Sequence, residues 1–344
     1  MSGTAFGSPS SEAPTATDCL IVGAGLAGLT AARRLAVAGQ SVVIVEKAKS
    51  VGGRLATRRI GRARLDLGAQ FFTVRSDTFE AEVEGWVRDG VAEEWCRGFG
   101  TEDGYPRYRA TEGMNAVAQH LRQRLMTDGE HPPVLATRSR VNAVIAGPDG
   151  WTLTYEAAKR EPDDGKAVIL TAPVPQSIEL MRSGGVGRAA LRELDAIKYN
   201  KAIAVLTTLD RTPNLPPPGA LQQPDDPVFT FVADNQTKGI SDVPAVTFHC
   251  AHKLSADLWD LDDGSVLARL HQDLRRYLGP ALVEDVQVKR WRYAGPVEPH
   301  PKPCALVVDQ PGPLVVAGDG FGQSKVEGAF LSGLAAAETV LANL

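Results

Sequence analysis

The stretch CLIVGAGLAGLTAARRLAVAGQSVVIVE, residues 19–46, decides the fold. Its first four residues, Cys19-Leu20-Ile21-Val22, are apolar and predict a short buried strand. The segment Gly23-Ala24-Gly25-Leu26-Ala27-Gly28 follows, and the alanine-rich residues 29–38 predict a helix. Residues 40–46 predict a second strand, which ends on an acid. This order of elements predicts a βαβ unit of a dinucleotide-binding fold.

The three glycines of the turn each have a physical role in such a unit. Gly23 permits the tight turn, Gly25 lets the backbone approach a pyrophosphate, and Gly28 lets helix and strand pack closely. The phosphate then lies at the helix N-terminus. Glu46, 18 residues after Gly28, is placed to accept hydrogen bonds from the adenosine ribose hydroxyls. Glycines also occur in turns that bind nothing, but the strand, helix and acid around these favour a dinucleotide.

A second glycine segment indicates which dinucleotide is bound. The doublet Gly52-Gly53 would let the chain pass close to another part of the ligand, and Arg54 would place a guanidinium beside its phosphates. This arrangement favours a flavin over a nicotinamide cofactor. Residues 66–73, with the sequence DLGAQFFT, predict a further backbone approach point followed by a strand. An ordinary hairpin is the alternative.

The C-terminal part of the chain carries a third cofactor signal. Residues 313–319 predict a strand that ends in Gly318-Asp319 and rejoins the first sheet, and residues 324–341 predict a helix with an apolar face. The N-terminus of this helix, near Lys325 and Val326, would then point at the ligand. Its partial positive charge would stabilise the negative charge at N1 and the C2 carbonyl of a reduced flavin. Plain packing of a terminal helix is the alternative.

Between these two ends, apolar periodicity predicts both helices and strands. The expected helices are residues 78–95, 113–125 and 265–278, the last of them capped by Asp262 or Asp263. The expected strands are residues 134–145, 151–155, 167–172, 228–233 and 245–250, and residues 184–200 and 213–227 are expected to be long connections.

The overall composition excludes several function classes. A chain of 344 residues with 43% hydrophobic and 23% charged residues is globular and long enough for two domains. Its 37 basic and 41 acidic residues give a net charge of −4, which offers no basic surface for nucleic acid or anionic lipid. No apolar run reaches the roughly 20 residues that a membrane span needs. Residues 1–17 predict a disordered tail without a signal-peptide pattern.

The cysteines and histidines predict neither a redox dithiol nor a metal site. The four cysteines form no Cys-x-x-Cys pair. So few cysteines in a long chain predict a cytoplasmic protein. His249 and His252 are three residues apart at a predicted strand end, which would point their side chains to opposite faces. We therefore expect no bound metal.

Together these segments resemble the two-domain flavoproteins of the amine oxidase superfamily, and among them the renalase family. The resemblance runs from about residue 18 to residue 344, with its motifs in the same order. The motifs are Gly23 to Gly28, Glu46, Gly52-Gly53-Arg54, Asp66-Leu67-Gly68-Ala69-Gln70, Thr171-Ala172-Pro173-Val174-Pro175, His249, Arg290-Trp291-Arg292 and Gly318-Asp319-Gly320-Phe321-Gly322-Gln323-Ser324. The first glycine motif is shared with many dinucleotide-binding proteins, whereas the Gly-Ala-Gln, Trp-Arg and Gly-Asp-Gly-Phe stretches are more specific.

The resemblance implies an α/β protein with a discontinuous Rossmann-like FAD-binding domain. The second domain would be an α+β substrate domain of the amine oxidase or p-hydroxybenzoate hydroxylase type. The first would comprise residues 18–76, 130–176 and 298–344, and the second residues 77–129 and 177–297. FAD would be bound non-covalently. The implied reaction oxidises 2- or 6-dihydro isomers of NAD(P)H to NAD(P)+ by hydride transfer to flavin N5, and O2 then reoxidises the flavin to give hydrogen peroxide.

The resemblance also assigns site residues. His249, Trp291 and Gln70 would be catalytic, and Phe71, Asn235 and Tyr293 would bind the substrate. The residues implied to contact the cofactor, with Val141 at the adenine, are Gly23, Gly25, Leu26, Ala27, Gly28, Glu46, Lys47, Gly53, Arg54, Gly68, Ala69, Gln70, Phe71, Val141, Gly318, Asp319, Lys325, Val326 and Glu327. Two features depart from the family pattern: the tail has no counterpart, and Glu112 places a carboxylate where an uncharged residue is expected.

Several alternatives stay open. A dihydropyridine gains aromaticity when it gives up hydride, so its oxidation needs no strong base. A neutral amine also gives hydride to a flavin, and an amine oxidase or desaturase is the second hypothesis. A flavin-binding redox sensor without turnover is the third.

For several individual residues the sequence allows both a role in the site and a purely structural role. His249 could belong to the site or be satisfied within its strand, and Trp291 could stack on a ligand or fill the interdomain core. Arg107 and Arg109 could bind a substrate phosphate or be solvated. Oligomeric state, the preference between NAD and NADP forms and the electron acceptor do not follow from the sequence.

Overall fold

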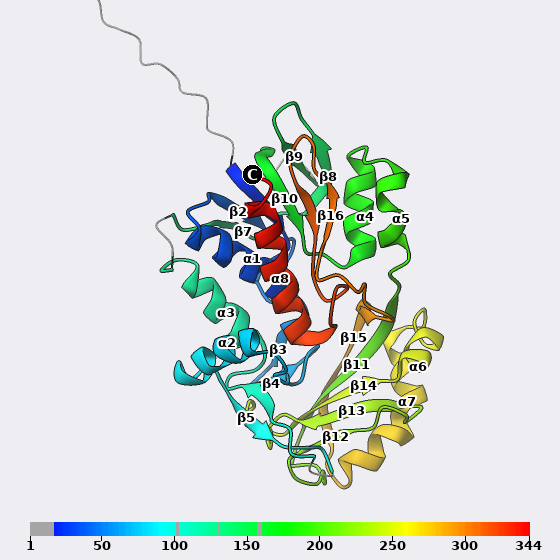
Figure 1. The fold of residues 1–344 in the computed structure, drawn as a ribbon. Helices are drawn as coiled ribbons and strands as arrows, with labels where there is room; N and C mark the ends of the chain where they lie inside the picture. Colours follow the sequence, from blue (N-terminus) through cyan, green and yellow to red (C-terminus); the bar gives the residue numbers. More distant parts are fainter. Residues whose placement is uncertain (1–16, 101–102, 129–130, 157–159) are drawn as a thin grey trace, which may run out of the picture.

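The computed structural model describes residues 17–100, 103–128, 131–156 and 160–344. Figure 1 shows two sheets, each with its own helices. The chain crosses between them at the start of β11 (Tyr199–Leu209) and the end of β15 (Val283–Pro296). The predicted tail, residues 1–17, lies outside the described residues except for Thr17, which begins β1.

The larger sheet has eight strands and is built around the predicted βαβ unit. Its central strand β1 is parallel to a neighbour on each side, so that Ile21 lies opposite Ile44 and Ile169. These inner strands are buried on both faces, which explains their continuous apolar sequences. The strands are, in sheet order, β16 (Ala305–Val308), β17 (Leu314–Val316), β10 (Asp163–Leu170), β1 (Thr17–Val22), β2 (Val42–Val45) and β7 (Val134–Ala136), with β9 (Trp151–Tyr155) pairing with β10 and β8 (Val141–Ala146) pairing with β9.

Helices cover both faces of this sheet. The first face carries α1 (Leu26–Val37), α2 (Asp77–Arg88), α3 (Asn115–Arg124) and α8 (Lys325–Leu341), which share one core with Ile21 and Ile44. The other face carries α4 (Val174–Ser183) and α5 (Arg188–Asp195), which pack with Leu20 and Leu170. The domain boundaries implied by the resemblance place residues 77–129 and 177–195 in the substrate domain. The helices in these ranges bury apolar side chains in the two cores that also contain residues of the larger sheet. The domain boundaries stay a prediction.

The smaller sheet has five antiparallel strands, and its two faces are covered differently. On one face Ile203 shares a core with α6 (His252–Asp257) and α7 (Asp263–Leu278). On the other, Leu206 packs against a hairpin that follows the second glycine segment. The strands of the smaller sheet are, in sheet order, β12 (Ala220–Gln222), β13 (Phe229–Asp234), β14 (Ala245–Cys250), β11 (Tyr199–Leu209) and β15 (Val283–Pro296). The hairpin consists of β3 (Thr57–Ile60) and β4 (Ala63–Asp66) and is preceded by the short helix η1 (Gly53–Leu55). A separate pair of strands is formed by β5 (Ala92–Cys96) and β6 (Arg107–Ala110).

The structure confirms the predicted mixed α/β fold, with several local differences. Residues 134–145 belong to two strands, β7 and β8, and β12 lies in the predicted connection of residues 213–227. The strand predicted after residues 66–70 is only an isolated bridge at Phe72.

The helix predicted for residues 78–95 ends at Arg88, because the chain turns at Gly90 with φ +70 and continues into β5. Helix α5 lies in a predicted connection, and it buries only Leu191 and Leu194. Strand β15 has no clear sequence signal, because only Val288 among its residues is buried and its apolar pattern is weak.

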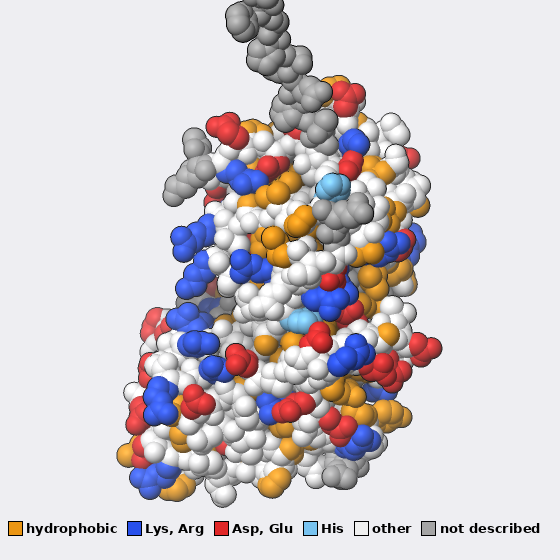
Figure 2. All heavy atoms as spheres, turned by 90° about the vertical axis from the view of Figure 1, so that its left-hand side faces the viewer, with side chains coloured by type: hydrophobic (Ala, Val, Ile, Leu, Met, Phe, Trp, Pro, Cys, Tyr) orange, Lys and Arg blue, Asp and Glu red, His pale blue; other side chains and the backbone are white. Residues whose placement is uncertain are grey.

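Side chains of both charge signs occur over the face of the molecule shown in Figure 2. This mixture agrees with the nearly balanced numbers of basic and acidic residues. Among the helices in the described part of the chain, none is long and apolar enough to cross a membrane.

The close packing of α8 on α1 depends on Gly333. A Cβ at this position would lie 2.3 Å from the carbonyl oxygen of Ala27 and 2.9 Å from its Cα. Because both are backbone atoms of α1, a side chain at Gly333 would have to push the two helices apart. Gly85 in α2 differs, since a Cβ there would meet no atom within 4 Å.

We predict that Gly333→Ala lowers the free energy of unfolding by about 1–3 kcal/mol, because the backbone of α1 must move to admit the methyl group. Gly85→Ala is the matched control and should raise this free energy by about 0.5–1 kcal/mol, since alanine is the better helix former. Urea unfolding followed by circular dichroism measures both. Equal effects of the two substitutions would contradict the packing described for Gly333.

Candidate functional site

The glycine turn after β1 has the geometry that a bound phosphate requires. Gly23 has φ +108, and a Cβ at Gly28 would lie 2.0 Å from the Gly23 carbonyl oxygen, so the turn itself needs glycine at both positions. A Cβ at Gly25 would meet no atom within 4 Å. The turn therefore leaves open space at Gly25, where the sequence predicts a pyrophosphate.

The N-terminus of α1 begins at this open space. Gly25 is the N-cap and offers no side chain to accept hydrogen bonds from the first N–H groups, and the first turn holds no acidic residue. Uncapped N–H groups and the positive end of the helix dipole bind anions. These features fit the pyrophosphate of a dinucleotide, with Leu26 and Ala27 in the first turn.

Glu46 directly follows β2 and is held by the backbone. Its Oε2 accepts a hydrogen bond from Ala24 N–H at 2.9 Å, and its Oε1 accepts one from Ala48 N–H at 2.7 Å. Each carboxylate oxygen keeps a further lone pair that can accept from a ribose hydroxyl. Ser139 N–H donates to the Glu46 carbonyl at 2.9 Å, which brings the start of β8, at Val141, to the same edge of the sheet.

Lys47 follows Glu46, but its side chain makes its hydrogen bond to a different residue. Its Nζ donates to Gln176 Oε1 at 3.2 Å, which ties the end of β2 to α4. Burial lowers the pKa of Lys47, and the charge of Arg140 lowers it further, while Glu46 opposes the shift.

The Gly52-Gly53 doublet packs directly against the glycine turn that follows β1. Gly52 N–H donates to the Ala24 carbonyl at 2.8 Å. A Cβ at Gly68 would lie 2.1 Å from the Arg54 carbonyl oxygen, and Ala69 N–H donates to that oxygen at 3.0 Å. The three glycine segments that the sequence singles out are thus brought together at the carboxyl end of β1.

Arg54 and Asp319, both expected to contact the cofactor, bind each other. The two terminal guanidinium nitrogens lie 2.5 Å and 2.6 Å from the two carboxylate oxygens. Tyr199 Oη donates to Asp319 at 3.2 Å, and Arg54 also donates to the backbone carbonyl of Tyr293 at 3.3 Å. Because Tyr199 and Tyr293 belong to β11 and β15, this pair ties the cofactor segments to the smaller sheet. Burial raises the pKa of Tyr199 above its usual range, and the Asp319 charge adds to the shift.

The N-terminus of α8 has an unusual backbone. Lys325, its first residue, has φ +80, a value that residues with side chains rarely adopt, and the N-cap Ser324 makes no capping hydrogen bond. This end of the helix, which includes the buried Val326, can therefore receive an anionic group. Glu327 is engaged elsewhere: its Oε1 accepts from Ser76 N–H at 2.8 Å and from Ser76 Oγ at 2.6 Å. Glu327 therefore fastens α8 to the start of α2.

A cluster of polar side chains lies where residues 66–70 meet β14, and it brings Gln70 and His249 together. Gln70 Nε2 donates to the Asp66 carbonyl at 2.7 Å and lies 3.4 Å from Nε2 of His249. His249 Nε2 lies 2.9 Å from the carbonyl oxygen of Leu67. Because a carbonyl oxygen only accepts, this ring nitrogen carries the hydrogen, and Nδ1 keeps the lone pair.

The His249 imidazole is neutral at physiological pH. Burial lowers its pKa to about 4, and the charge of Lys238 lowers it further, while the Leu67 carbonyl and the Asp66 charge oppose the shift. An imidazole with this pKa is too weak a base to take a proton from a substrate at neutral pH.

The sequence analysis missed Lys238, which completes the cluster. Its Nζ lies 2.6 Å from Oδ2 of Asp66, and both side chains are 0% exposed. Burial lowers the pKa of Lys238, while the Asp66 charge opposes the shift. Lys238 follows β13 in a polar segment with the sequence NQTKG, and nothing in such a segment indicates a buried ammonium.

Asn235, implied to bind the substrate, lies behind the cluster. Its side chain is fully buried, and its Nδ2 donates to Thr247 Oγ1 at 3.0 Å. Thr247 Oγ1 donates in turn to the Asp66 carbonyl at 3.1 Å. The Asn235 side chain therefore supports the cluster through hydrogen bonds within the protein, and its contact with a substrate stays a prediction.

Aromatic side chains accompany the cluster. The Phe71 ring lies 5.0 Å from the ring of Phe99 and 5.7 Å from that of Phe231, measured between centroids. Tyr293 packs edge-on against Tyr199 at 5.8 Å. Trp291 Nε1 is buried and has no hydrogen-bond partner among the described residues. A buried donor without an acceptor indicates a missing partner at this position.

Arg107 and Arg109 form ion pairs. The sequence leaves open whether these arginines bind a substrate phosphate or are solvated. Arg107 pairs with Asp103, and Arg109 pairs with Glu93. Each also keeps one buried guanidinium nitrogen without a partner among the described residues.

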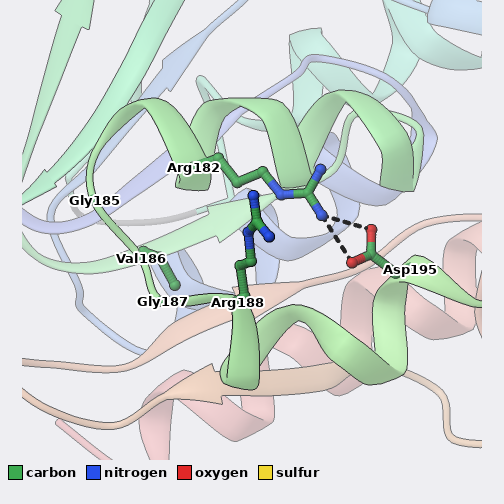
Figure 3. A pocket seen from close by; sticks show the side chains of 6 residues that line it. All are labelled: Arg182, Gly185, Val186, Gly187, Arg188 and Asp195. Carbon is green, nitrogen blue, oxygen red and sulfur yellow. Dashed lines mark hydrogen bonds and ion pairs between the residues drawn. The ribbon is translucent and has the colours of Figure 1, made fainter.

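A surface hollow of about 620 Å³ lies at the connection of α4 and α5 (Figure 3). Arg182 donates there to both carboxylate oxygens of Asp195, at 2.9 Å and 2.8 Å, and Arg188 lies beside this pair. None of the residues expected to bind cofactor or substrate lines the hollow. We therefore place the candidate site at the glycine turn and the polar cluster.

Comparison with known proteins identifies two sequence families in the chain. The family described as an NAD(P)-binding Rossmann-like domain matches residues 21–82, which include the first two glycine segments. The family described as a flavin containing amine oxidoreductase matches residues 81–341, more than half of the chain.

Individual relatives resemble the chain in two ways. The putrescine oxidase of Kocuria rosea is 41% identical over 63 residues, which are 18% of this chain and only 13% of that enzyme's length. A protein of Exiguobacterium sp. 255-15, provisionally described as a protoporphyrinogen oxidase, aligns over 96% of this chain and 100% of its own, with a TM-score of 0.70 and 12% identity. A putrescine oxidase bound to putrescine aligns over 95% of this chain and 99% of its own, with a TM-score of 0.64 and 17% identity. At such low identities the structural likeness shows the fold alone.

We predict that Gly25→Val leaves the stability of the apoprotein unchanged but weakens FAD binding by about tenfold or more, because a side chain would fill the space for the pyrophosphate. Titration of FAD fluorescence and thermal unfolding of the apoprotein measure the two effects. Gly28→Ala is the comparison variant: it should lower the stability of the apoprotein itself, since its Cβ meets backbone at 2.0 Å. FAD affinity of wild-type strength in Gly25→Val would argue against the site.

Proposed function

This chain belongs to the flavin containing amine oxidoreductase family, and we propose that it is an FAD-dependent oxidase of renalase type. It is a flavin-dependent oxidoreductase with FAD as its cofactor. We propose that the reductant is a 2- or 6-dihydro isomer of NAD(P)H, which gives a hydride to flavin N5 and leaves as NAD(P)+. Molecular oxygen would then accept the two electrons together with two protons, one that arrived with the hydride and one from solvent, and leave as hydrogen peroxide.

The described residues fit non-covalently bound FAD. The open space at Gly25 and the uncapped start of α1 suit its pyrophosphate, and Glu46 suits its ribose. The start of α8, at Lys325, suits the electron-rich end of its ring system. FAD, when bound, supplies the hydride acceptor N5.

The observation that carries the proposal is that the polar cluster offers no free base. His249 has a pKa of about 4. The Asp66 carboxylate accepts from Lys238 at 2.6 Å, from Thr57 at 2.6 Å and from the backbone of Met114 at 2.8 Å. A dihydropyridine becomes aromatic as its hydride leaves and needs no base. An alkylamine is protonated at neutral pH and must lose that proton first.

The remaining site residues would place the dihydropyridine ring. Efficient transfer needs the donor carbon about 3–3.5 Å from N5. Phe71 would offer a flat apolar face, and Tyr293 would bound the ring from the side of β15. Trp291 Nε1, a buried donor without a partner among the described residues, would donate to the carboxamide oxygen of the nicotinamide.

Oxidation of an amine is the second candidate function. The sequence match to putrescine oxidase and the aromatic group of Phe71, Phe99 and Phe231 favour it, since an aromatic pocket suits a neutral amine. Such a reaction would accelerate with rising pH as the amine loses its proton.

We predict that a borohydride-made mixture of NADH isomers bleaches the flavin absorbance at about 450 nm roughly tenfold or more faster than benzylamine or putrescine does. The limiting rate should stay constant from about pH 5.5 to pH 9, because His249 becomes protonated only near pH 4. Anaerobic stopped-flow absorbance measures both, with ordinary NADH as the control for the ring position of the hydride.

Each other outcome has a definite meaning. Bleaching by the amines alone, with a rate that rises with pH, would replace the proposal by the second candidate. If no reductant bleaches the flavin, both enzymatic functions fail and a flavin-binding redox sensor takes their place.

A further inference from the structure

The chain just after the polar cluster lies alongside β6, and the two segments together present two different faces. Phe72 N–H donates to the Tyr108 carbonyl at 2.9 Å, and Tyr108 N–H donates to the Phe72 carbonyl at 2.8 Å. The rings of these two residues stack at 5.6 Å on the face that joins the core of the larger sheet. Because side chains alternate along extended backbone, Phe71 and Arg107 lie on the opposite face. Arg107 therefore shares a face with the ring that the proposed function places beside the dihydropyridine.

Contacts on this second face lead outward from Phe71 to the protein surface. The Phe71 ring lies 5.0 Å from the Phe99 ring, and the Arg107 guanidinium lies 5.9 Å from the centre of the Phe99 ring. Arg107 Nη1 donates to the backbone carbonyl of Tyr105 at 2.7 Å. Tyr105 is 55% exposed, and the Arg75 guanidinium lies over its ring at 4.7 Å from the centre. These contacts form a continuous track from Phe71 to Tyr105.

The two arginines of the track have unused capacity for an anion. Arg107 pairs with Asp103, but its Nε is buried and has no partner among the described residues. A buried donor without an acceptor indicates a missing partner. Arg75 is exposed and forms no ion pair within the described part of the chain. Because guanidinium groups bind phosphate through several N–H donors, these two residues suit a phosphorylated ligand.

The exposed ring of Tyr105 suits a flat group at the outer end of the track. Nucleobases stack on aromatic side chains whatever their sequence, because every base has a flat face. A diamine has no such face, and the unpaired charge of Arg75 would repel its ammonium groups. The track therefore matches a nucleotide and not an alkylamine.

We propose that Arg107, Arg75 and Tyr105 bind the adenosine diphosphate half of the reductant, with its phosphates at the arginines and its adenine stacked on Tyr105. This inference rests on the proposed function, because it takes the dihydropyridine ring to lie at Phe71. It makes the reductant a dinucleotide, since a mononucleotide with the same ring would have no adenine to stack on Tyr105.

The first test is calorimetric binding of ADP-ribose, which has the adenine and both phosphates but no nicotinamide, to the FAD-bound protein. Tyr105→Ala and Arg75→Gln should each raise its Kd about fivefold or more. Both side chains are exposed, so the variants should fold and keep their FAD. The matched control is Arg276→Gln: Arg276 also lies over a tyrosine ring, at 5.8 Å, but in α7 on the other face of the smaller sheet. Its Kd should equal that of the wild type.

The second test compares dihydro isomers made by borohydride from NAD+ and from nicotinamide mononucleotide. The wild type should be half-saturated by the dinucleotide isomers at an about tenfold lower concentration. Tyr105→Ala should lose most of this advantage, while its limiting rate of flavin reduction stays within about twofold of the wild-type rate, because the track binds the reductant and does not touch the reacting carbon.

Two results would overturn the proposal: ADP-ribose that binds the wild type with a Kd above about 1 mM, or Tyr105→Ala and Arg75→Gln variants that bind it as tightly as the wild type. If no isomer reduces the wild-type flavin, the proposed function fails. The ADP-ribose measurement, which needs no turnover, then still decides whether the track is a nucleotide site.

Discussion

The buried ion pair of Asp66 and Lys238 is the interaction on which the arrangement of the site depends. Two charges cost more to remove from water than their attraction returns, unless hydrogen bonds satisfy the rest of each group. Removing one partner alone would leave an unpaired buried charge, at a cost of about 3–5 kcal/mol. The charges of Asp66 and Lys238 can therefore be buried only when three segments come together: β4, which carries Asp66, the turn after β13, which carries Lys238, and the start of α3, which donates a backbone N–H to Asp66. That meeting fixes residues 66–70 against β14.

The cofactor side of the site depends on the close approach of backbone segments and not on a buried ion pair. Glycines let three segments meet at the carboxyl end of β1, where α1 begins without a side-chain cap. Helix α8, which packs on the start of α1 through Gly333, also begins without a side-chain cap. Arg54 and Asp319 then connect this backbone cradle to β11 and β15 of the smaller sheet. The cradle and the buried polar cluster thus share the segment from Arg54 to Gln70, so a ligand held by the first would lie beside the second.

The sequence predicted the βαβ unit and its glycine turn, because these signals are local. Gly23, Gly25 and Gly28 lie within one turn, and the neighbouring strand and helix give each a steric reason. Lys238 could not be predicted, because its burial depends on Asp66, which is 172 positions away in the chain. The apolar stripe of α2 shows an amphipathic helix, but the sequence does not say which sheet buries it. The domain boundary at residue 77 therefore stays a prediction.

In the proposed reaction the site orients its reductant and does not deprotonate it. A pH titration of the His249 imidazole in the FAD-bound protein tests this most directly, by NMR of ¹³C-labelled histidine with His249→Gln to assign the signal. The account predicts a neutral ring at physiological pH and a midpoint near 4. A midpoint at or above about 6.5, the ordinary value for histidine, would place a working base in the site and contradict it.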